Sequence, residues 1–87
     1  MNDNQEIVFP LDWEFRIVAI SEAVDTAQAQ VLGILHRIDE NATVSRGLES
    51  RGGKYVTLRA ICRIENREIL KNISDALAAA DGVKMLI

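Results

Sequence analysis

Residues 52–64 read GGKYVTLRAICRI, and this stretch decides the fold because it specifies a turn followed by a strand. The glycine pair permits a tight reversal, since glycine adopts positive φ angles without steric cost. The residues after it alternate in polarity, which is the period of a β-strand. We therefore predict a long strand with one buried face and one open, basic face. The apolar face comprises Val56, Leu58, Ala60, Cys62 and Ile64, and the open face comprises Tyr55, Thr57, Arg59, Ile61 and Arg63.

A second alternating stretch, residues 13–20, predicts a strand that lies beside the first. Weaker strands are predicted over residues 43–50, with a bulge at Gly47, and over residues 83–87. The side chains expected to form the core of the two central strands are Phe15, Ile17, Leu58, Ala60 and Cys62.

Two segments with apolar residues at helical spacing separate these strands. We expect Ser21 to cap the first helix, and we attribute Gly33 within it to a close approach to the sheet. Asn66 is expected to cap the second helix, and Gly82 to end it in the left-handed conformation. The apolar stripes are Val24, Ala27, Val31, Ile34, Leu35 and Ile38 in the first helix, and Ile69, Leu70, Ile73, Ala76, Leu77 and Ala80 in the second.

The resulting order, βαββαβ, predicts an α+β ferredoxin-like plait. Its four-stranded antiparallel sheet should have the order 4-1-3-2, with both helices on one face. We expect one domain over residues 9–87, preceded by a flexible leader at residues 1–8. Phe9 either packs against the domain edge as a lid or belongs to the leader.

Composition favours a soluble, cytoplasmic protein. The acidic first residues do not resemble a signal peptide, and no apolar run is long enough to span a bilayer. The single cysteine excludes an internal disulfide framework. A net charge of −3 argues against nucleic acid as the default partner.

The chain resembles the YbeD-like family of small bacterial proteins of unknown function. The resemblance rests on Phe9-Pro10, on residues 15–18 (FRIV), on residues 50–55 (SRGGKY) and on residues 83–87 (VKMLI). It implies the same plait, which is similar to the ACT regulatory domains that bind amino acids, and a link to lipoate metabolism by genomic context. ACT domains of that kind carry a glycine at the first strand-to-helix turn, where this chain reads AISE at residues 19–22.

No residue pattern specifies a reaction, and we expect no catalytic residue, metal or cofactor. No sequence motif pairs His36 with a nucleophile or a carboxylate, and Cys62 is expected on the buried face of its strand. The turn Arg51, Gly52, Gly53 and Lys54 is either an ordinary hairpin turn or a cradle for an anion.

The most informative feature is the open face of the predicted sheet, which mixes cations with aliphatic side chains. It is either a solvated surface or an interaction face. The first hypothesis is a non-enzymatic regulatory or adaptor domain that contacts a protein partner, or itself, through this face or an edge strand. The alternatives are an ACT-like sensor of an amino acid or lipoate-related metabolite, and single-stranded nucleic acid binding. The residues expected on the face are Arg16, Val18, Thr57, Arg59, Ile61, Arg63, Lys84 and Leu86.

Overall fold

The computed structural model describes residues 7–87, so most of the predicted leader lies outside the described residues. Its four strands form one antiparallel sheet in the order β2-β3-β1-β4, which confirms the predicted plait. The strands are β1 (Leu11–Ile20), β2 (Thr43–Glu49), β3 (Tyr55–Ile64) and β4 (Val83–Leu86). The two long central strands pair without a register shift, from Leu11 opposite Ile64 to Ile20 opposite Tyr55.

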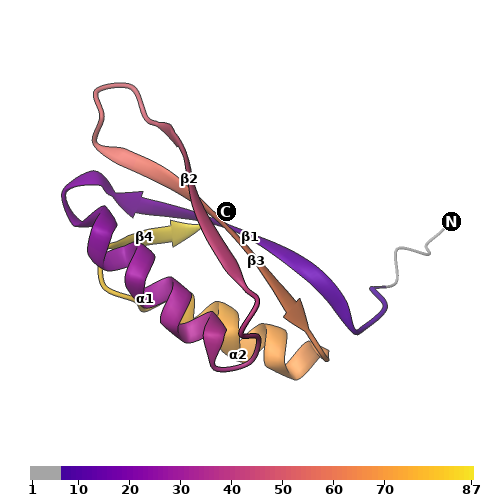
Figure 1. Ribbon diagram of the computed structural model, residues 1–87. Coiled ribbons are helices and arrows are strands. Elements are labelled where there is room, and N and C mark those ends of the chain that lie inside the picture. The colour runs from indigo at the N-terminus through magenta and orange to yellow at the C-terminus, as the bar shows by residue number, and fades with distance from the viewer. Residues whose placement is uncertain (1–6) are drawn as a thin grey trace, which may run out of the picture.

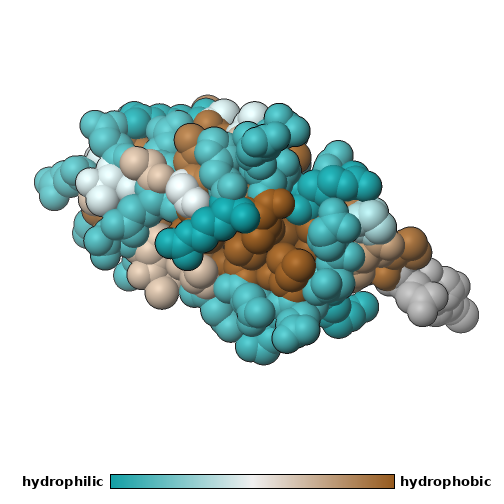
Figure 2. Space-filling view, turned by 60° about the horizontal axis from the view of Figure 1, so that its bottom comes forward, coloured by the Kyte–Doolittle hydropathy of each residue, from teal (hydrophilic) through white to brown (hydrophobic). Residues whose placement is uncertain are grey.

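The two helices, α1 (Val24–His36) and α2 (Arg67–Ala78), cover one face of this sheet and leave the other face open (Figure 1). The predicted core is confirmed, because the inward side chains of β1 and β3 are buried with α1 and α2. Seen from the helix side, apolar side chains gather in the middle and hydrophilic ones surround them (Figure 2). Phe9 also packs against the core, and the Arg67 guanidinium carbon lies 5.9 Å from its ring centroid.

The first helix begins differently from the prediction. Ser21 does not cap α1: residues Ser21–Ala23 form a 3₁₀ turn, and no side chain caps the helix that follows. The Ser21 N–H instead donates to the Lys54 carbonyl at 3.0 Å, which ties the end of β1 to the β2–β3 turn. The second cap is confirmed, since the Asn66 side chain accepts a hydrogen bond from the Ile69 N–H at 2.9 Å.

Two of the glycine predictions, the close approach at Gly33 and the helix end at Gly82, differ from the structure. Gly33 is exposed, and a Cβ added there would meet nothing within 4 Å, so it marks no close approach to the sheet. The close approach lies at Gly82, where a Cβ would come within 2.8 Å of the Ala23 carbonyl oxygen. Gly82 has the predicted positive φ, +81°, but α2 already ends at Ala78. Gly82 therefore shapes the turn into β4 and does not end α2.

Two bulges interrupt the outer strands. In β2 the register shifts between Arg46 and Glu49, so Gly47 and Leu48 together oppose Thr57, as the expected bulge at Gly47 requires. In β4 the shift falls between the partners of Val18 and Ala19 and leaves Lys84 as the extra residue. Because Thr57 pairs with Val18, the two bulges lie in one row across the sheet.

Candidate functional site

The candidate site is the face of the sheet that the helices leave uncovered. Strand register places the β1 and β3 side chains of the predicted face there, with Arg16 opposite Arg59 and Val18 opposite Thr57. Ile61 and Arg63 share this face, opposite Glu14 and Asp12, and Lys84 lies exposed in the β4 bulge.

The prediction for Leu86 was wrong. It pairs with Ile17, a core residue, and packs against the core from the helix side. The extra residue Lys84 changes the alternation of β4, so that Met85 pairs with Val18 on the open face. Because β4 has only four residues and one of them is the bulge, its polarity pattern does not show which face Leu86 occupies.

The sequence prediction also missed the most protruding apolar residues of this face. Leu48 is 87% exposed, Ile87 is 70% exposed and Met85 is 48% exposed. Leu48 and Met85 lie in the row of the two bulges, and the Ile87 N–H bonds the Arg16 carbonyl at 2.9 Å. The open face therefore carries more exposed apolar side chains than its alternating pattern indicated.

Ion pairs organise the charges of the face. Glu14 Oε2 accepts from Arg59 Nε at 3.0 Å and from Arg16 Nε at 3.2 Å. These bonds, that from Arg59 first, lower the pKa of the Glu14 carboxyl below its usual value. The prediction counted the arginines and omitted Glu14, although strand alternation places them on one face. The face is thus an ordered charge network and not a bare cationic patch.

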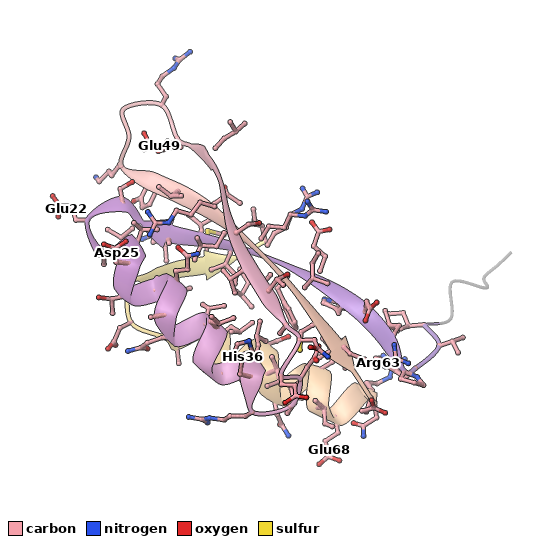
Figure 3. All side chains as sticks on the ribbon, in the orientation of Figure 1. Glu22, Asp25, His36, Glu49, Arg63 and Glu68 are labelled. Atoms are coloured by element: carbon pink, nitrogen blue, oxygen red, sulfur yellow. The ribbon has the colours of Figure 1, made fainter. Side chains whose placement is uncertain are left out.

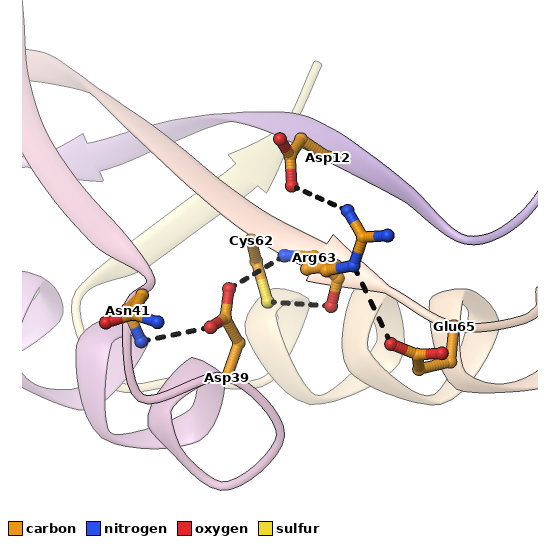
Figure 4. Close-up of polar contacts among 6 residues, drawn as sticks. All are labelled: Asp12, Asp39, Asn41, Cys62, Arg63 and Glu65. Atoms are coloured by element: carbon orange, nitrogen blue, oxygen red, sulfur yellow. Dashed lines mark hydrogen bonds and ion pairs between the residues drawn. The ribbon is translucent and has the colours of Figure 1, made fainter.

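Arg63 belongs to a second charge cluster at the far end of β3 (Figure 4). Its guanidinium lies 3.7 Å from Asp12 Oδ1 and 3.9 Å from Glu65 Oε2. Its backbone N–H donates to Asp39 Oδ2 at 2.9 Å, while Asp39 Oδ1 accepts from the Asn41 N–H at 3.0 Å. Asp39 therefore fastens the α1–β2 turn to β3.

We expect this fastening to fail in acid. The bond from the Arg63 N–H, followed by that from Asn41, lowers the pKa of Asp39 below its ordinary 3.8. A lowered folded pKa means that the stabilisation is present above pH 3.8 and is lost as the pH falls through the folded value. The urea midpoint should fall between pH 5 and about pH 2, and Asp39→Asn should make this fall shallower. Glu68→Gln, a surface carboxyl on α2 (Figure 3), is the control; equal slopes for wild type and Asp39→Asn would contradict the assignment.

The predicted anion turn forms one wall of a cavity of about 380 Å³. Gly52 and Gly53 have positive φ, and the opposite wall consists of Ile20, Ser21 and Glu22; Arg51 is not among the lining residues. The structure thus joins this turn to the end of β1, a juxtaposition that no local pattern revealed. The surrounding charges oppose a simple anion. Glu22 lines the cavity, and a Cβ on Gly53 would meet Glu49 Oε1 at 3.4 Å; both carboxylates lie at this end of the molecule (Figure 3).

His36 and Cys62, the two side chains considered for catalysis, have surroundings typical of structural residues. His36 Nε2 donates to the Ala42 carbonyl at 3.0 Å. Burial raises the pKa of the Cys62 thiol to about 11, with smaller contributions from Asp39 and Asp12, so the thiol stays protonated at neutral pH. Within residues 7–87 no three His, Cys, Asp or Glu side chains are grouped to hold a metal ion. The described helices include none with the length and apolar character to cross a membrane.

Comparison with known families gives a match to a protein family of unknown function, DUF493, over residues 4–87. The chain belongs to the DUF493 family. No curated protein matches this DUF493 chain. It is similar to two solution structures of protein HP0495 from Helicobacter pylori, each 15% identical to it. The match to the first structure has a TM-score of 0.81 and covers 97% of this chain and 88% of the HP0495 chain. The match to the second has a TM-score of 0.64 and covers 100% of this chain and 96% of the HP0495 chain. These likenesses support the fold of the DUF493 chain.

Proposed function

We propose that this protein is a non-enzymatic binding domain that contacts another protein through the open face of its sheet. The observation that carries the proposal is the exposure of Leu48, Met85 and Ile87 on a face without covering helices. Exposed apolar side chains that cluster on one face are typical of a contact surface. Two arginines of the same face, Arg16 and Arg59, bind Glu14, which favours one orientation of each before a partner arrives.

The charges of the open face indicate what kind of surface its partner carries. Four cations lie on or beside the face, namely Arg16, Arg59, Arg63 and the bulge residue Lys84, against the three carboxylates of Asp12, Glu14 and Glu65. A second copy would bring these cations together, whereas an acidic surface with apolar side chains would complement them. We therefore propose a partner protein with an acidic, apolar surface. A regulatory or adaptor role in the cytoplasm and membership of the YbeD-like group are further parts of the proposal, supported by the sequence resemblance. The observations favour a small anionic ligand less, because Glu22 lines the cavity and Glu49 lies beside Gly53 in its wall.

The double variant Leu48→Asp, Met85→Asp tests this proposal. Both side chains are exposed, so circular dichroism and the melting temperature should change little, while any protein captured by the wild type should be lost. Ile38→Asp is the matched control, since Ile38 is 39% exposed in the turn after α1. Cross-linking mass spectrometry then locates the contact on the chain, and size-exclusion with light scattering measures self-association.

The result expected is a partner with an acidic surface, cross-linked to the strands on the open face and retained by Ile38→Asp. Three outcomes contradict the proposal. The double variant retains the partner, the cross-links map to the helices, or the wild type is a dimer that the double variant separates.

A further inference from the structure

The N-terminal half of β1 has a neighbour on one side only. β3 pairs with β1 from Leu11 to Ile20, whereas β4 pairs only with Ile17–Ala19. Single hydrogen bonds extend β4 by one residue at each end, from the Ile87 N–H to Arg16 and from the Ile20 N–H to Gly82. Within the described chain, residues 11–15 therefore lack a strand on this side. In Figure 1 this half of β1 runs on beyond the C-terminus.

The direction of the backbone groups follows from these two bonds. In an antiparallel strand the N–H and C=O of one residue point to the same side, and the side alternates along the chain. Arg16 and Ile20 direct theirs toward β4. Asp12 and Glu14 therefore direct theirs to the same, uncovered side.

This edge is suited to pairing with another strand. A row of free N–H and C=O groups is a template for strand addition, which natural sheets commonly block with bulges. Both outer strands contain a bulge, but the pairing of β1 with β3 is regular throughout residues 11–15. The free stretch is about 17 Å long at the usual rise of a strand.

We propose that an extended segment of another protein binds along residues 11–15 of β1 as an added antiparallel strand, in line with β4. The side chains of β1 define this segment. Leu11 and Trp13 are only half-buried on the helix side, so apolar residues fit opposite them. On the open face Asp12 is 70% exposed, and its ion pair with Arg63 is long at 3.7 Å. A basic residue therefore fits opposite Asp12, while Glu14 already binds two arginines.

The inference goes beyond the proposed function, because it concerns an edge of the sheet and a segment of opposite charge. An experiment can also contradict this inference while the proposed function stands, and the reverse. Leu48→Asp, Met85→Asp alters the open face in a different row and should leave binding at this edge unchanged.

The test uses a blocked, fluorescent peptide of alternating lysine and valine, with an alternating glutamate and valine peptide as its control. Asp12→Pro removes one edge N–H together with the Asp12 carboxylate and its ion pair with Arg63. It leaves the backbone bonds between β1 and β3 intact, since those belong to the odd-numbered residues of β1. It should weaken binding of the lysine peptide about tenfold. Asp12→Asn keeps the N–H and should reduce only the preference for lysine over glutamate. Native-state hydrogen exchange provides a readout without mutation.

In the free protein the amides of Asp12 and Glu14 should exchange quickly and those of Trp13 and Phe15 slowly. The lysine peptide should protect the first pair. Slow exchange at Asp12 and Glu14 in the free protein would overturn the inference, because the edge would already be occupied. The inference also fails if the peptide does not bind, or if it binds Asp12→Pro as tightly as the wild type. Should Asp12→Pro not fold, the exchange measurement on the wild type decides.

Discussion

Gly82→Ala should destabilise the protein by about 2–5 kcal/mol, combining the cost of a left-handed alanine with that of overpacking. The added Cβ would lie 2.8 Å from the Ala23 carbonyl oxygen and 3.1 Å from the Ala27 Cβ. A backbone atom cannot move aside as a flexible side chain can, so the turn into β4 must shift. That shift loosens the 2.8 Å bond from the Ile20 N–H to the Gly82 carbonyl. Urea denaturation measures the loss.

Gly33→Ala is the matched control for this substitution. Gly33 lies within α1 with open space around it, so alanine should stabilise the protein by about 0.5–1 kcal/mol. The same change at two glycines thus has opposite signs. A Gly82→Ala protein as stable as the wild type would show that the turn and α1 are not in close contact.

Leu58→Ala should cost about 2–5 kcal/mol, as expected for a cavity in a close-packed core. Leu58 is fully buried in β3, opposite Ile17 and beneath the helices. A chain of this length has a total stability of roughly 4–13 kcal/mol, so the variant should be largely unfolded or melt far below the wild type.

Ile61→Ala, in the same strand, is its control. Ile61 points to the open face and is 38% exposed, so its truncation should cost less than about 1 kcal/mol. Chemical denaturation of both variants compares the two faces of β3 directly. Equal losses would contradict the assignment of the faces.

Strand alternation was sufficient to predict the sheet, its order and its buried face. It succeeds over residues 55–64 because each inward residue is apolar and the strand contains no bulge. It fails at Leu86, since one extra residue in β4 reverses the faces beyond it. No face was predicted for Leu48, which lies in the bulge of β2 opposite Thr57. The bulge in β2 was predicted from Gly47, whereas the bulge in β4 is set by pairing with β1 and no residue of β4 signals it.

Contacts between distant segments account for the other errors. The meeting of Gly82 with Ala23, and that of Ser21 with Lys54, depend on how the helices and turns are placed over the sheet. Local sequence signals predicted a close approach to the sheet at Gly33 in α1 and a helix cap at Ser21, and neither is present. The arginine network could have been predicted more fully, because the spacing of Glu14 and Arg16 already puts them side by side.

The row of bulges has a consequence for how relatives of this chain can vary in length. Removing Lys84 would leave Val83 opposite Ala19 and Met85 opposite Val18, so every ladder position of β4 would survive the deletion. Removing either Gly47 or Leu48, the two residues opposite Thr57, would likewise preserve every ladder position of β2. Single-residue gaps in family alignments should therefore collect at these two points of the sheet, while the central strands keep a constant length.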